Sequence, residues 1–263
     1  MGKSTRDGHQ RFRKIFTIYS VALIGVLFVL LAPPIPQDPE YHNFSDQRTM
    51  IGIPHFWNVV TSLPFLVVGI IGLLTLLHRK SLKYSRSLLK CYLVFYAATC
   101  AIGIGSAYYH LHPTNETLVW DRLPMTVAFM AFFSIIIGEY ISEKTGKRLF
   151  LPLIIAGIIS VAYWYFTEKY GHGDLRPYAL VQYLPLFLIP MILVMFRSRF
   201  LRSKYIWIML GVYVFAKVFE IWDGYMYNLT VFMGGHSIKH VLAALVPLIF
   251  IVALKKQNDN EAN

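Results

Sequence analysis

The chain has 263 residues, of which 56% are hydrophobic and only 15% are charged, and its mean hydropathy is +0.50. This composition, with repeated apolar segments of about 18 to 24 residues, excludes an ordinary soluble domain and indicates a polytopic, all-α membrane protein. The formal net charge of +11 does not indicate a nucleic-acid-binding protein, because Lys and Arg gather in short connections between apolar segments.

The apolar pattern predicts eight spans within a single membrane domain. The first follows a basic tail and ends in APPIPQDP rather than in a cleavage site, so we interpret it as a retained helix. Pro64 is expected to kink the second span. The connection 33–55 either folds back as a cap or is a plain linker. The predicted spans are 15–32, 56–78, 88–111, 121–141, 149–167, 178–196, 204–222 and 236–254.

The distribution of Lys and Arg predicts the orientation of these spans. The N-terminal tail and alternate connections hold most of the basic residues, including Arg79, Lys80, Lys83 and Arg199. The positive-inside rule therefore places both termini in the cytoplasm. The opposite side receives only Arg48, Arg122, Lys169 and Arg176.

Five polar residues fall near span ends that this topology puts on the outer side. Ser106 and His110 are four residues apart, as are His236 and His240, so each pair shares one helix face. Asp121 opens the fourth predicted span. Because spans three and eight run in opposite directions, all five lie at similar depth. Ionisable groups inside membrane helices are costly and therefore predict a functional site.

Three histidines with an open fourth position form the donor set of catalytic zinc sites, in which a bound water is acidified. Asp121 then acts on that water as a base, and Ser106 hydrogen-bonds the water or an oxyanion. Interhelical polar contacts are the alternative for the histidines. For Asp121 the alternatives are an ion pair with Arg122 or a helix cap.

Two further interpretations concern neighbouring polar residues. A Ser-His-Asp hydrolase is disfavoured, because no GxSxG motif surrounds Ser106 and a triad leaves two histidines unused. His112 is expected in a loop. Lys217 and Glu220, three residues apart in the seventh span, are expected to form an intrahelical ion pair.

The order of these motifs resembles the CREST superfamily of seven-helix membrane hydrolases, and within it the bacterial alkaline ceramidases. The resemblance covers roughly residues 44–254. It rests on FWNVVTSLP at 56–64, GSAYYH at 105–110, WDRLPM at 120–125 and GHSIKH at 235–240.

The resemblance implies a zinc-dependent amidohydrolase that cleaves a ceramide-like lipid from the bilayer into a sphingoid base and a fatty acid. It implies that His110, His236 and His240 bind Zn²⁺, and that Ser106 and Asp121 are catalytic. We expect an extra helix in residues 1–35, a hydrolase domain in 36–255, and a disordered tail in 256–263. The site is expected near the non-cytoplasmic face, in a bacterial inner membrane.

Other functions stay open from the sequence alone. One is hydrolysis of a different lipid amide or ester. Another is a seven-helix lipid-binding receptor in which zinc is structural. A transporter is disfavoured, because the sequence shows no inverted repeat and the polar residues gather at one end.

Overall fold

The computed structural model describes residues 2–78, 82, 84–198 and 200–256, and within these the chain is helical without strands. A short 3₁₀ turn spans Pro39–His42, a second spans Arg86–Leu88, and a π-helical segment spans Ile137–Ile141. The α-helices are α1 (Gly2–Leu31), α2 (Phe56–Val60), α3 (Leu63–His78), α4 (Leu89–Leu111), α5 (Asn115–Ile136), α6 (Glu143–Lys169), α7 (Arg176–Met195), α8 (Ser203–Ile221), α9 (Asp223–Thr230) and α10 (Gly235–Lys255).

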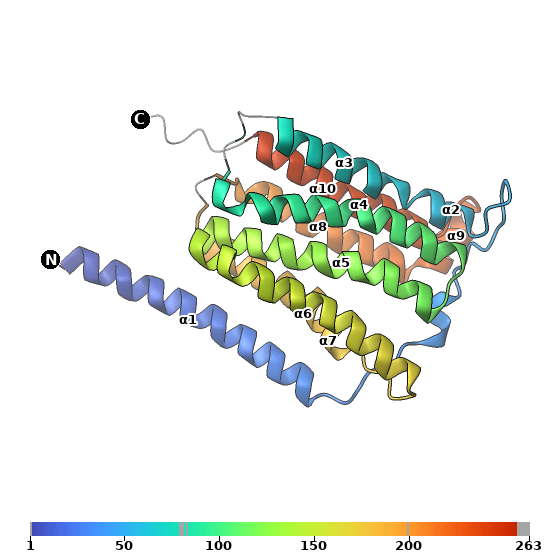
Figure 1. Ribbon diagram of the computed structural model, residues 1–263, viewed down its shortest axis with the longest axis horizontal. Coiled ribbons are helices and arrows are strands. Elements are labelled where there is room, and N and C mark those ends of the chain that lie inside the picture. Colours follow the sequence, from blue (N-terminus) through green and yellow to red (C-terminus); the bar gives the residue numbers. More distant parts are fainter. Residues whose placement is uncertain (1, 79–81, 83, 199, 257–263) are drawn as a thin grey trace.

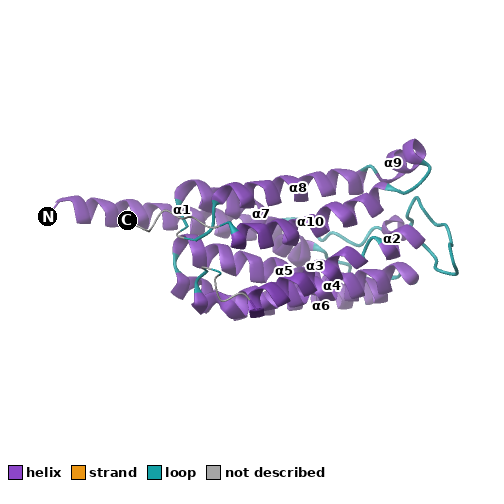
Figure 2. Cartoon of the chain, turned by 90° about the horizontal axis from the view of Figure 1, so that it is seen from above, coloured by secondary structure: helices purple, strands orange, loops and turns teal. Residues whose placement is uncertain are grey.

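Seven helical stretches of the described chain are long and apolar enough to cross a membrane, which confirms the predicted polytopic fold. The predicted span 204–222 lies in α8, which meets this criterion only together with α9. The two helices are bent by 79° at a short break. Figure 2 shows α9 leaving the line of α8 at the end of the bundle that also carries α2.

Helix α1 lies outside the main bundle, along α7 (Figure 1). Only 6% of its most apolar window is buried, so most of its surface is available to lipid. Close to its middle, Lys14 Nζ donates to the Met195 carbonyl (2.8 Å). Near its end, the Leu30 carbonyl accepts from Arg176 (3.0 Å). Polar contacts at its middle and its end thus fix an otherwise weakly packed helix.

The start of α1 and the end of α10 lie at one end of the bundle, and α2 and α9 lie at the other (Figure 1). The two ends of the described chain therefore lie at the same end of the bundle, while the side of the membrane on which that end lies stays a prediction. Four basic residues used in that prediction, Arg79, Lys80, Lys83 and Arg199, lie outside the described residues, as do residues 257–263 of the predicted tail.

Residues Phe56–His78 form one candidate span, as predicted, but the α-helix is interrupted inside it, because α2 ends at Val60 and α3 begins at Leu63. Pro64 stands in the first turn of α3, where a missing backbone N–H leaves no helical bond unmade. At the break, Thr61 Oγ1 donates to the Trp57 carbonyl (2.5 Å) and Ser62 Oγ to the Asn58 carbonyl (2.8 Å). The break leaves polar groups inside the bundle.

Helix α5 begins at Asn115 rather than at the predicted residue 121, because Thr114 caps it with a reciprocal capping box to Thr117. Asp121 is therefore past the first turn, and the prediction that it is a helix cap is wrong. Gly105 of α4 faces the Trp120 carbonyl of α5 so closely that a Cβ atom has no room. This glycine brings the backbones carrying Ser106 and Asp121 together.

Candidate metal and catalytic site

The structure brings together the three predicted histidines of α4 and α10. His110, His236 and His240 are 0%, 5% and 3% exposed, and one ring nitrogen of each lies within 4.8 Å of the others. His110 Nε2 and His240 Nε2 are 3.3 Å apart. Residues far apart in sequence thus meet because the end of α4 lies beside the start of α10.

Polar groups at the α2–α3 break hold the His240 ring. Its Nδ1 lies 3.2 Å from the Asn58 carbonyl, 3.2 Å from Thr61 Oγ1 and 3.4 Å from Ser62 Oγ. Hydrogen bonds at one imidazole nitrogen fix the ring and leave the other nitrogen for a ligand. The broken helix therefore directs Nε2 of His240 toward His110.

The start of α10 is anchored in a different way. The Asp223 carboxylate accepts from the backbone N–H of His236 (2.8 Å), and its other oxygen accepts from the backbone N–H of Ser45 (2.9 Å). Gly235 faces the Phe219 carbonyl with no space for a Cβ atom. These contacts fix the backbone that carries His236 against the end of α8.

Ser106 and Asp121 are also buried, at 2% and 7% exposure. Ser62 Oγ lies 3.1 Å from Ser106 Oγ, and both Ser106 and Asp121 line the same cavity as His240. The hydrogen-bond partner of Ser106 is a serine and not a histidine ring, which disfavours the Ser-His-Asp alternative further. Ser106 and Asp121 form a pair beside the histidine cluster.

Arg122 does not take part in that pair, although it follows Asp121 directly. Its Nη2 donates to Gln37 Oε1 (2.7 Å), and its guanidinium carbon lies 4.2 Å from the Trp164 ring centroid and 4.7 Å from that of Tyr178. Among the ion pairs of the described residues, none joins Asp121 to Arg122. The carboxyl group of Asp121 is thus left for the site.

The connection 33–55 folds back over the histidines, so of the two predicted alternatives the cap is confirmed. Phe44, 4% exposed, places its ring 4.7 Å from that of His110 and 4.5 Å from that of His236. His42 Nδ1 is hydrogen-bonded to the Tyr109 hydroxyl (2.9 Å), and Arg48 donates to the Phe232 carbonyl. Phe44 covers the histidines from the end of the bundle.

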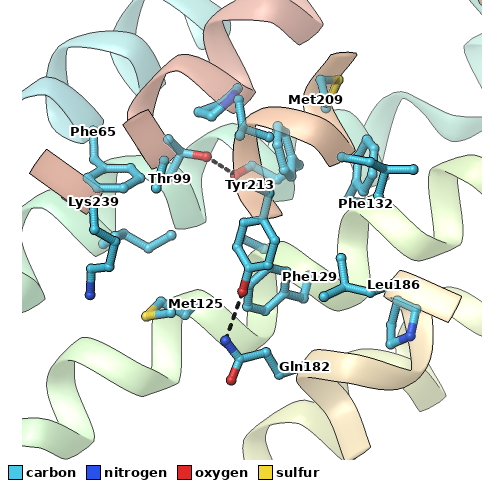
Figure 3. A pocket seen from close by; sticks show the side chains of 18 of the residues that line it. Phe65, Thr99, Met125, Phe129, Phe132, Gln182, Leu186, Met209, Tyr213 and Lys239 are labelled. Atoms are coloured by element: carbon cyan, nitrogen blue, oxygen red, sulfur yellow. Dashed lines mark hydrogen bonds between the residues drawn. The ribbon is translucent and has the colours of Figure 1, made fainter. Parts of the chain in front are cut away.

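An apolar cavity of about 130 Å³ reaches the same cluster from inside the bundle (Figure 3). Its polar end is lined by Ser106, Asp121, Lys239 and His240, and its far end by Phe95 and Val246. From Phe95 to Ser106 the α4 axis covers about 16 Å at its rise per residue. Such a shape suits a long apolar chain with one polar, reactive end.

One polar bridge crosses the cavity wall between α7 and α8. Gln182 Nε2 donates to the Tyr213 hydroxyl (2.8 Å), and both residues line the cavity (Figure 3). Helices α7 and α8 make few other contacts with each other. The Gln182–Tyr213 hydrogen bond therefore joins the two helices at the cavity wall.

The donor set fits a divalent transition metal. Three imidazole nitrogens are the ligands that zinc takes in catalytic sites. Among the described residues, His110 Nδ1 is buried without a hydrogen-bond partner and its Nε2 faces His240 Nε2, so neither ring nitrogen of His110 is bound to a carboxylate or carbonyl. Within the described part of the chain the cluster consists of three histidines and no carboxylate, which is the protein ligand set of one type of catalytic zinc site.

Sequence reasoning found the five polar residues but missed those that position them. Phe44 and Thr61 received no site role, and His55, taken as an ordinary loop residue, bonds through Nδ1 to the His110 carbonyl (3.0 Å). Asn58 and Ser62 were visible only as polar residues inside an apolar span. The predicted Lys217–Glu220 pair is confirmed, and His112 caps the end of α4.

Comparison with known families agrees with this geometry. The family model described as Ceramidase matches residues 48–261, which begins after α1 and covers the site described above. A comparison with curated proteins finds no match. The matched region covers most of the chain, and the chain belongs to the ceramidase family, whose members are hydrolases that act on the amide bond of ceramide.

Proposed function

We propose that the protein is a zinc-dependent hydrolase that cleaves the amide of a ceramide-like lipid to a sphingoid base and a fatty acid. The main support for this proposal is a single cavity, which is apolar inside the bundle and is lined at its polar end by Ser106, Asp121 and His240. The acyl chain lies in the apolar part, and the amide stands at the polar end.

In this proposal His110, His236 and His240 hold the zinc. When bound, the metal polarises the amide carbonyl and lowers the pKa of a coordinated water. The Asp121 carboxylate accepts the proton of the water whose oxygen attacks the carbonyl carbon. Asp121 then gives this proton to the nitrogen as the C–N bond breaks, so that an amine and a carboxylic acid result.

Ser106 is proposed to donate its one hydroxyl hydrogen to the developing oxyanion. Phe44 and the cap keep bulk water from the histidines, while the apolar cavity supplies the lipid. The residues are thus arranged for one water to react in an otherwise dry site.

We further propose that residues 1–35 are an addition to a hydrolase domain of residues 36–255, because the family match begins after α1. The site end of the bundle is assigned to the non-cytoplasmic side, because α1 begins and α10 ends at the opposite end.

The test is hydrolysis by purified protein in detergent, with ceramide and matched lipid esters as substrates. We expect release of fatty acid and sphingoid base, loss of activity on chelation, and recovery on adding zinc. His172→Ala, in an exposed loop, is the control and keeps full activity. Release from the ester but not from the amide would reassign the substrate class. No release from any substrate would reject an enzymatic role and favour a structural zinc.

A further inference from the structure

Two lysines share one carboxylate next to the proposed catalytic groups. Glu220 of α8 pairs with Lys217 one turn earlier, and its Oε1 accepts from Lys239 Nζ of α10 (3.0 Å). The side chains of Glu220 and Lys239 are 15% and 14% exposed. Since Lys217 takes part of the Glu220 charge, Glu220 neutralises Lys239 only in part.

Lys239 is the cation of this group that reaches the cavity. Lys239 lines the cavity (Figure 3). Ser106, Asp121 and His240 line it too, whereas Glu220 and Lys217 are not among its lining residues. Lys239 Nζ lies 3.3 Å from His236 Nε2. The ammonium group is therefore beside the place where the amide is cleaved.

The chemistry of an ammonium group limits what it can recognise there. Lysine carries three N–H donors and no acceptor, so its partner at the cavity must be an acceptor, and an anionic oxygen binds most strongly. A charge in a membrane-spanning segment is costly unless it meets a counter-charge. Among the residues that line the cavity, Asp121 is the one carboxylate near Lys239, and the proposed function assigns it to the attacking water; most of the remaining lining is apolar.

The geometry also fits the spacing within a sphingoid lipid. In such a lipid the head oxygen is joined to the amide nitrogen through only two carbons. A group on that oxygen therefore stays close to the reacting amide. Lys239 lies between the two histidines of α10 in sequence, and its Nζ lies 3.3 Å from His236 Nε2.

We propose that Lys239 makes the protein selective for lipid amides with an anionic headgroup, specifically a phosphate ester on the head oxygen of the sphingoid base. This inference rests on the proposed amidase function. Glu220 and Lys217 position Lys239, and the phosphate supplies the second counter-charge during binding.

The experiment compares an N-acyl sphingoid base with its 1-phosphate, carrying the same acyl chain, on purified full-length protein in mixed micelles. We expect wild type to favour the phosphate in kcat/KM. Lys239→Met should lower the ratio of the two kcat/KM values by about 10- to 100-fold, the effect of one charge-assisted hydrogen bond. Lys239→Arg should retain most of the preference.

Lys169→Met is the matched control, because it removes an exposed outer lysine far from the cavity lining. It should leave the ratio unchanged, which excludes general attraction between the protein surface and the micelle. An equal ratio in wild type and Lys239→Met, or a wild-type preference for the neutral lipid, overturns the inference while leaving the amidase function standing. Hydrolysis of neither amide by zinc-loaded wild type rejects both.

Discussion

Two buried carboxyl groups of α5 and its π-helical extension show what distinguishes a reactive group from a structural one. Glu139, 8% exposed, accepts hydrogen bonds from the Tyr92 hydroxyl (2.8 Å) and the backbone N–H of Ser85 (3.2 Å). Asp121 is equally buried, but it lines the cavity beside the histidines. Burial alone does not mark a site; access to a cavity and to a metal-binding cluster does.

The largest expected loss of activity comes from replacing one of these two carboxyl groups, that of Asp121. Asp121→Asn should lower kcat/KM for the lipid amide by about 10²- to 10⁴-fold, because an amide cannot accept and return the proton. Zinc content should be unchanged, since Asp121 is not assigned as a ligand. Both quantities, kcat/KM and the zinc content per chain, are measured on the same preparation.

Glu139→Gln is the matched variant for that comparison. It weakens a buried hydrogen bond and should lower the melting temperature. Its kcat/KM per folded molecule should equal that of wild type. A loss of catalysis as large as that of Asp121→Asn would mean that the two carboxyl groups do not differ as described.

A smaller effect is expected where α4 and α5 touch. Gly105→Ala places a methyl group against the Trp120 carbonyl, so the backbones must separate, at a cost of about 1–3 kcal/mol of stability. The Ser106–Asp121 pair should be disturbed, with activity falling as well. Denaturation and kinetics measure the two effects.

Gly211→Ala is the control for this helix packing, because a Cβ atom there meets nothing within 4 Å. It should be neutral or stabilise α8 by about 0.5–1 kcal/mol. If both glycine variants behave alike, close approach at Gly105 does not position the site.

The smallest effect concerns the groups that orient His240. Ser62→Ala removes a hydroxyl near Ser106 and His240. The loss of one hydrogen bond should raise the activation free energy by about 1 kcal/mol, which lowers kcat/KM roughly five- to tenfold. Ser160→Ala is the comparison, since its hydroxyl donates within its own helix to Gly157 (2.7 Å). An unchanged rate in Ser62→Ala would show that the remaining contacts suffice to hold the ring.

The sequence was enough to predict that the three histidines lie together, because polar residues that interrupt apolar spans stand out. His236 and His240 are four residues apart, so they share one helix face. Because successive spans run in opposite directions, His110 lies at the same depth in the membrane as these two histidines. The charge of Lys239 within a span was visible too, but its place at the cavity depends on how α8 and α10 pack. Phe44 lay in a connection whose path no local pattern determines.

Helix boundaries near the site show the same limit. The start of α5 was misplaced because hydropathy does not register the Thr114 cap, and this error made Asp121 look like a cap itself. The break between α2 and α3 was expected only as a kink at Pro64. Its functional consequence, polar groups directed at His240, follows from tertiary packing.

The central claim is that His110, His236 and His240 hold one catalytic zinc. Metal analysis of purified protein tests it most directly, with wild type, His240→Ala and the loop variant His172→Ala prepared in parallel. We predict about one zinc per chain in wild type and His172→Ala, and almost none in folded His240→Ala. Equal zinc in His240→Ala and wild type, or a folded and active wild type without metal, would contradict the account.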